Sequence, residues 1–109
     1  KKIDTDNIGF SGHSQGGTGV FNAITDSHHS FLYKTAVSLS PTQPAGAALL
    51  KFPYDLQKTN IPILVLAGTE GDFETKMVIP LEAMDSMDSV ITTPNIVARR
   101  IGADHGQTL

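Results

Sequence analysis

The sequence predicts an α/β fold built on a parallel sheet. Four short apolar runs alternate with stretches of helix-favouring composition, in the order strand, helix, strand, helix, strand, helix, strand. Turn-forming residues bound each apolar run, which is typical of buried strands in a parallel sheet that is covered on both faces. Successive parallel strands then require right-handed crossovers through the intervening helices.

The third predicted strand is the clearest, since IPILVLA is rich in Ile, Leu and Val and ends at Gly68. Within the first predicted helix, Val20, Phe21 and Ile24 have the spacing of one apolar face. The third predicted helix begins with Pro80, a residue suited to a first helical position. The predicted strands span residues 7–11, 35–39, 61–67 and 95–101, and the predicted helices span residues 16–25, 45–51 and 80–87.

The composition is that of a chain that folds but carries no marks of nucleic-acid or membrane binding. Its 109 residues suffice for one small domain or part of one, with 39% hydrophobic and 17% charged residues. The net charge of −3, with scattered Lys and Arg, excludes a basic surface for nucleic acid. No apolar run approaches the roughly 20 residues that span a bilayer.

Cysteine is absent, which excludes a disulfide framework, a thiolate nucleophile and a thiolate-bound metal. This absence does not indicate a cellular compartment. The chain begins with Lys1 and has no signal-peptide pattern, so we expect the start of the protein to lie upstream.

The strongest functional signal is the motif Gly12-His13-Ser14-Gln15-Gly16, between the first predicted strand and the first predicted helix. A G-x-S-x-G sequence in that context is typical of a nucleophile elbow, with Ser14 on a strained turn. We expect glycine at positions 12 and 16 because larger side chains there would clash with neighbouring backbone. The helix N-terminus and the N–H of Gln15 would then face an oxyanion.

The alternative is a glycine-rich turn that contains a serine by chance, and the flanking strand and helix favour the elbow. Phosphate-binding loops fit less well, because the sequence has neither G-K-[ST] nor a G-x-G-x-x-G at the start of a helix.

His105 is the predicted general base, in the small-residue loop GADHG just past the last predicted strand. In a parallel sheet this is the edge at which the elbow also lies. The alternative is a solvated loop histidine. We expect the turn to point His13 elsewhere, and we expect His28 and His29 at the surface near a helix C-terminus. A metal site at the latter pair lacks a third ligand.

Asp72 is the predicted orienting carboxylate, because it follows the third strand at the same edge. Glu70 and Glu74 are close competitors, and Asp104 is a weaker one because adjacent side chains in a loop usually diverge. The chain order Ser14, Asp72, His105 is the serine, acid, histidine order of nucleophile-elbow enzymes.

Together these segments resemble the α/β-hydrolase superfamily. GHSQGG is similar to the elbows of esterases, dienelactone-hydrolase-like enzymes and cutinase-like polyester hydrolases. IPILVLAGTEGD resembles their I-P-x-L-x-x-x-G-x-x-D segment, in which the aspartate is the triad acid, and GADHG resembles their histidine loop. GTEGDF is slightly longer than the family's acid loop, which leaves Glu70 open beside Asp72. The resemblance implies that residues 1–109 are the C-terminal half of such a domain, with family strands five to eight and the N-terminal half absent.

The resemblance also implies a serine hydrolase that cleaves carboxylic esters through an acyl-enzyme on Ser14, with His105 as base and Asp72 fixing its imidazole. The N–H of Gln15 would share the oxyanion with a donor outside this chain. No cofactor or metal is implied, and the ester would be small or polymeric. Residues 42–61 are too few for a large lid, which favours accessible acyl esters.

Alternatives are peptidase, thioesterase or acyltransferase chemistry on the same triad, or a non-catalytic binding protein that retains the fold. We expect the chain to need its missing half or an associating chain.

Overall fold

The computed structural model describes residues 2–108, which contain one four-stranded sheet in the order β1-β2-β3-β4. All three neighbouring pairs of strands are parallel. The strands are β1 (Ile8–His13), β2 (Tyr33–Leu39), β3 (Ile63–Gly68) and β4 (Asn95–Arg100). The α-helices are α1 (Gln15–Thr25), α2 (Pro44–Leu49) and α3 (Leu81–Val90). The predicted α/β class and the predicted alternation of elements are therefore confirmed.

Short helical turns complete the chain. The 3-10 turns are η1 (Ser30–Leu32), η2 (Leu56–Lys58) and η4 (His105–Thr108). A π-helical turn, η3 (Phe73–Val78), lies between β3 and α3 and has no counterpart in the sequence-based prediction. The predicted helix at 80–87 begins one residue later, because Pro80 is the N-cap of α3. Pro44, in contrast, takes the first turn of α2, where its missing N–H costs nothing.

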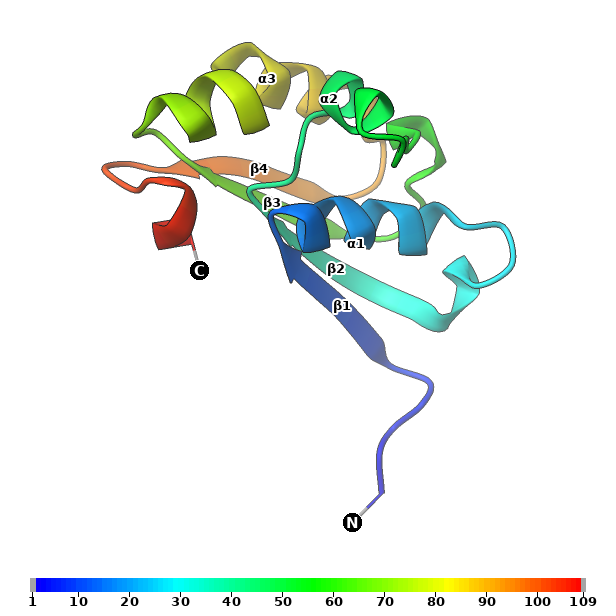
Figure 1. Ribbon diagram of the computed structural model, residues 1–109. Helices are drawn as coiled ribbons and strands as arrows, with labels where there is room; N and C mark the ends of the chain where they lie inside the picture. The colour runs from blue at the N-terminus through cyan, green and yellow to red at the C-terminus, as the bar shows by residue number, and fades with distance from the viewer. Residues whose placement is uncertain (1, 109) are drawn as a thin grey trace.

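The hydrophobic core lies between the sheet and the helices. Val20, Phe21 and Ile24 of α1 are fully buried, as their spacing predicts, and they belong to one cluster with Ile63 and Val65 of β3. Figure 1 shows α1, α2 and α3 on the same face of the sheet. Burial of these apolar side chains is the main free-energy gain that holds the helices to the sheet.

The opposite face of the sheet is open in the described part of the chain. Val37, Leu64 and Ile96 pair in one row across β2, β3 and β4 on this face. Val37 and Leu64 are half-buried, and Ile96 is 64% exposed. The prediction of cover on both faces is thus met on one face only, because all three α-helices pack on the other side.

The carboxyl ends of the strands bring the sequence motifs to one edge. β1 ends at the elbow, β3 leads into η3, and β4 is followed by η4, which begins at His105 (Figure 1). Parallel pairing aligns these strand ends, so residues separated by about 90 positions meet there. None of the helices in residues 2–108 has the length and hydropathy to cross a membrane.

Candidate active site

Ser14 sits on a strained turn between β1 and α1. Its backbone has φ 59° and ψ −121°, outside the regions that a non-glycine residue adopts without cost. Its N–H donates to the carbonyl of Leu39 at 2.9 Å, which fixes the turn against the end of β2. The Ser14 side chain makes no capping hydrogen bond to α1, so its hydroxyl is free to point into the site.

The glycines of the elbow are not equivalent. A Cβ on Gly12 would lie 2.3 Å from the carbonyl oxygen of Gly16, so the steric requirement predicted at position 12 is met. A Cβ on Gly16 would meet no described atom within 4 Å, so the clash predicted there is not found. A Cβ on Gly17 would lie 2.8 Å from the carbonyl oxygen of Leu39. The second close approach therefore falls on Gly17, where α1 crosses the end of β2.

A continuous line of hydrogen bonds joins a serine, a histidine and a carboxylate. Ser14 Oγ lies 2.9 Å from Nε2 of His105, and His105 Nδ1 lies 2.6 Å from Oε2 of Glu74. The fold brings Ser14 and His105 together, as predicted. The acid in contact with the histidine is Glu74, which belongs to η3.

The predicted contact between Asp72 and His105 is wrong. The Asp72 side chain is 81% exposed and pairs with Lys76 Nζ at 3.0 Å, one helical turn along η3. Glu70 is also exposed, and its carboxylate accepts from the Thr69 hydroxyl. The physical reason lies in η3, because its winding turns Asp72 outward and brings Glu74 and Val78, four residues apart, to the buried side.

Glu74 is fully buried and is held by two donors besides the histidine. Ser40 Oγ donates to Oε1 at 2.6 Å, and the N–H of Gly68 donates to the same oxygen at 2.8 Å. Burial favours the neutral acid, but the hydrogen bonds from Ser40, Gly68 and His105 outweigh it and hold the pKa of Glu74 below its ordinary value. Glu74 is therefore a carboxylate at neutral pH and accepts only. Nδ1 of His105 then carries a proton, which leaves Nε2 of a neutral imidazole to accept from Ser14.

A second layer of polar side chains surrounds this line. Ser40 Oγ lies 2.7 Å from Oγ1 of Thr108, and the Thr108 hydroxyl donates to the carbonyl oxygen of His105 at 3.1 Å. His13 Nε2 lies 2.7 Å from that same carbonyl oxygen, and the two imidazole rings are 4.8 Å apart. The His13 ring therefore contacts the histidine loop and not Ser14 Oγ, and the sequence did not predict this contact with the loop.

Sequence reasoning named Glu74 only as a competitor and missed Ser40 and Thr108. Glu74 carried one usable signal, its four-residue spacing from the apolar Val78. Ser40 directly follows the second predicted strand, but nothing in the sequence announces its buried position at φ 45°. Thr108 lies three residues past His105, and nothing in the sequence indicates its contact with Ser40 either.

The remaining candidates lie at the surface. His29 binds Asp26 at the end of α1, and His28 is exposed, as predicted. Asp104 accepts from the N–H groups of Gly106 and Gln107 and so caps the turn that presents His105. Among residues 2–108, no group of three His, Asp or Glu side chains is arranged to hold a metal ion.

Ser14 opens onto a cleft of about 450 Å³. Phe73 and Met77 of η3 are exposed apolar walls of this cleft, and Phe73 packs edge-to-face on His105 with ring centroids 5.0 Å apart. Gln15, the first residue of α1, also lines it. First-turn N–H groups of a helix have no intrahelical partner, so the backbone of Gln15 can donate to an anion in this cleft.

Comparison with known proteins finds similarity in structure and none in sequence. No protein-family model matches the chain, and no curated protein sequence does. An acylaminoacyl peptidase in complex with Z-Gly-Gly-Phe-chloromethyl ketone matches with a TM-score of 0.68 at 17% identity, over 97% of this chain and 21% of that one. An uncomplexed acylaminoacyl peptidase of Pyrococcus horikoshii gives 0.63 at 16% identity, over 97% of this chain and 21% of that one. Its orthorhombic crystal form gives 0.67 at 17% identity, over 95% and 20%.

The chain thus spans about a fifth of the length of these structures, and at this identity the likeness concerns the fold alone. Acylaminoacyl peptidases are α/β-hydrolases. Four parallel strands with flanking helices, superposed over nearly the whole chain on such a structure, show that the fold is that of a part of an α/β-hydrolase domain.

Proposed function

We propose that this chain carries the catalytic centre of a serine hydrolase that cleaves carboxylic esters through an acyl-enzyme on Ser14. The observation that carries the proposal is the unbroken hydrogen-bond line from Ser14 Oγ through His105 to the buried Glu74. A serine needs an adjacent base to become a nucleophile, and the base needs an orienting acceptor. Each of these needs is met within hydrogen-bond distance.

In the first step, Nε2 of His105 takes the proton from Ser14 Oγ as that oxygen bonds to the acyl carbonyl carbon. The imidazolium then carries two protons, and the Glu74 carboxylate stabilises its charge through Nδ1–H. His105 next protonates the leaving oxygen, and the bond between the acyl carbon and that oxygen breaks. In the second step, His105 takes a proton from water as the water oxygen bonds to the acyl carbon. His105 then returns the proton to Ser14 Oγ as the bond between Oγ and the acyl carbon breaks and the acid is released.

The oxyanion of the tetrahedral intermediate needs donors aimed at the attacked carbonyl oxygen. The N–H of Gln15 at the start of α1 supplies one, and the helix dipole adds its positive end. The family resemblance implies that a second donor comes from a segment outside these 109 residues.

An amide-cleaving peptidase is the second candidate. Its support is that the structural neighbours named above are acylaminoacyl peptidases. The same triad serves both reactions, but an amide needs His105 to protonate a poorer leaving group. Thioesterase and acyltransferase chemistry would use the same acyl-enzyme with a different leaving group or acceptor.

A substrate panel on the complete protein distinguishes these reactions. We expect p-nitrophenyl esters to be hydrolysed faster than matched thioesters and than N-acetyl-aminoacyl p-nitroanilides, and Ser14→Ala to remove all of these activities. Faster turnover of the anilides would establish the peptidase, and product transfer to an added alcohol would establish an acyltransferase. No turnover of any substrate, together with no labelling by a fluorophosphonate, would establish a binding protein that retains the fold.

A further inference from the structure

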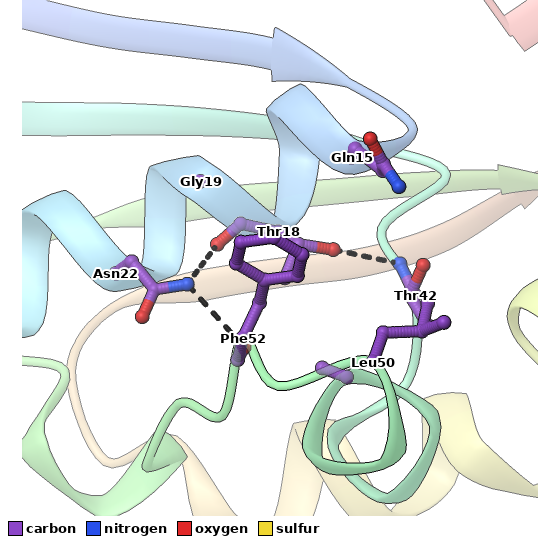
Figure 2. Close-up of a pocket in the computed structure, with 8 residues that line it drawn as sticks. Gln15, Thr18, Gly19, Asn22, Thr42, Leu50 and Phe52 are labelled. Atoms are coloured by element: carbon purple, nitrogen blue, oxygen red, sulfur yellow. Dashed lines mark hydrogen bonds between the residues drawn. The ribbon is translucent and has the colours of Figure 1, made fainter.

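A second, smaller cavity lies beside the cleft of Ser14. It has a volume of about 100 Å³ and lies between α1 and the segment that carries α2 and Phe52 (Figure 2). Gly19 and Thr18 of α1 form one wall, and Leu50 and Phe52 form the facing wall. We call this cavity the α1 pocket.

The α1 pocket adjoins the cleft of Ser14. Gln15, Thr42 and Leu50 line both. Gln15 follows the nucleophile directly and holds the proposed oxyanion donor. Gly19 lies four residues further along α1, which is about 6 Å along the helix axis. A group attached to a carbonyl carbon at Ser14 therefore reaches the α1 pocket along the first turn of α1.

Several polar groups around the α1 pocket already have partners. Thr18 Oγ1 accepts from the N–H of Thr42 at 3.1 Å, and Asn22 Nδ2 lies within 3.5 Å of the carbonyl oxygens of Thr18 and Phe52. Figure 2 shows these hydrogen bonds, which join α1 to the segments that contain Thr42 and Phe52. The apolar part of the lining consists of Gly19, Leu50, Phe52 and the buried Ala47, and Gln15 lies at the end shared with the cleft. An uncharged, aliphatic occupant fits this lining.

The chemistry of the triad decides which half of the ester faces the α1 pocket. His105 must protonate the leaving oxygen, so the alcohol lies on the side of His105 and Phe73. Neither residue lines the α1 pocket. The acyl half therefore points along α1.

We propose that the α1 pocket is an acyl-chain site that takes an unbranched aliphatic chain of about five or six carbons. We take about 30 Å³ for a methylene group, which is the volume per molecule in liquid water. The α1 pocket of about 100 Å³ then has room for roughly three methylenes. The carbonyl carbon and its first neighbours occupy the cleft above Gln15. This inference rests on the proposed function and names the acyl group that the same site selects.

Gly19 offers a direct test. A Cβ at Gly19 would meet no described atom within 4 Å, so Gly19→Leu fills the α1 pocket without a backbone clash. The readout is the ratio of kcat/KM for p-nitrophenyl hexanoate to that for p-nitrophenyl acetate, measured on the complete protein. Each buried methylene is worth about fourfold, from roughly 0.8 kcal/mol, so a wild-type ratio above about tenfold is expected. Gly19→Leu should bring this ratio close to one, and Gly19→Ala should lower it only in part.

Ser86→Leu, which adds the same side chain at an exposed position of α3, should leave the wild-type ratio unchanged. Phe52→Ala removes a wall of the α1 pocket and should move the preference to octanoate, which tests the site even if Gly19→Leu does not fold. Hydrolysis of acetate with an unchanged ratio in Gly19→Leu, and no shift in Phe52→Ala, would overturn the acyl-chain site and leave the proposed function standing. A wild-type protein that hydrolyses neither ester would instead refute the proposed function.

Discussion

Glu74 is the residue on which the geometry of the site depends most. It is a fully buried carboxylate whose Oε1 is occupied by Ser40 and Gly68, so only Oε2 is left for His105. The donors on Oε1 fix the rotation of the carboxylate. The imidazole is thereby held in the tautomer that can accept the serine proton.

Replacing each carboxylate by its amide distinguishes the role of Glu74 from that of Asp72. Glu74→Gln retains the shape of the side chain but presents an amide N–H₂ or a weaker acceptor to Nδ1, which favours the wrong tautomer. We expect kcat to fall by about 10⁴. Asp72→Asn is the matched control, since its side chain faces solvent, and it should retain near wild-type kcat. A large loss in Asp72→Asn with normal turnover in Glu74→Gln would restore Asp72 as the acid.

Ser40 is a positioning residue that acts through Glu74. Ser40→Ala removes one donor from the carboxylate, so the pKa of Glu74 should rise, and kcat should fall about tenfold for a lost bond of roughly 1.5 kcal/mol to a charged group. Thr108→Val, with Thr108→Ser as the variant that keeps the hydroxyl, tests the neighbouring contact. Equal kcat in Ser40→Ala and wild type would show that Ser40 does not orient the acid.

The pH dependence of the free energy of unfolding in the acid range distinguishes a role of Ser40 through the charge of Glu74 from a role in packing alone. The folded pKa of Glu74 lies below its reference value of 4.5, so its stabilising contribution is complete above pH 4.5 and is lost as the pH falls through the lowered folded value. In Ser40→Ala the folded pKa of Glu74 is higher, so the loss of stability below pH 4.5 should be smaller and should end at a higher pH. Urea unfolding of the complete protein between pH 3 and 6 measures the shift. Coincident profiles would contradict the role assigned to Ser40.

The sequence predicts Ser14 and His105 because each has a local signature: one motif, one loop, each directly after a strand. Ser40 and Thr108 have no such signature, and Glu74 has only its spacing from Val78, because their contacts join segments 31 to 68 residues apart. The nearest acid to a strand end is a good guide when a plain loop follows the strand. It fails here because a helical turn follows instead and changes which side chain faces inward.

At the scale of elements, η3 is the part that the sequence does not predict. π-helical turns have no characteristic amino-acid composition, and the segment FETKMV is equally compatible with a loop. The strands and α-helices were predictable to within about two or three residues, because each has a strong apolar pattern and a proline or glycine boundary. π-helical turns are frequently found at functional sites, where they redirect a side chain.

Arg99 ties the two ends of the segment that contains η3. Its Nη1 donates to the carbonyl of Gly68 at 2.6 Å, and its Nη2 donates to the carbonyls of Ile79 and Pro80 at 2.6 and 2.9 Å. A planar guanidinium reaches all three acceptors at once, which an ammonium group does not. Arg99 therefore links the end of β3 to the residues that follow η3, the turn that carries Glu74.

Replacing Arg99 should loosen this segment. We expect Arg99→Met to lower the free energy of unfolding by about 2 kcal/mol, with Arg99→Lys in between, because charged hydrogen bonds are lost. Limited proteolysis should then cut within residues 69–78 first. Urea unfolding with an unchanged m-value measures the stability, and a wild-type value in Arg99→Met would show that the three contacts contribute nothing.

At the scale of the whole molecule, parts of the sheet lack cover within residues 2–108. β1 pairs with β2 alone among the described strands, and the sheet face with Val37, Leu64 and Ile96 carries no helix. An unpaired edge strand and an open apolar face both favour association. We propose that further chain segments or an associating chain cover them in the complete protein.

Residues 1–109 expressed alone should therefore not be a competent monomeric enzyme. We expect a solution mass above that of one chain, measured by light scattering, and negligible esterase activity. Ile96→Lys places a charge on the open face without touching the core and should reduce the association. A cooperatively folding monomer with normal turnover would contradict this account of the open surfaces.

The central claim, that Ser14 is a nucleophile activated by His105 and Glu74, is tested most directly by covalent labelling. The complete protein is treated with a fluorophosphonate, and the modified residue is identified by peptide mass spectrometry. We predict a single adduct on Ser14 that forms much more slowly in Glu74→Gln and is absent in His105→Ala and Ser14→Ala. An adduct on another serine, or labelling of Ser14 at the same rate without His105, would contradict the claim.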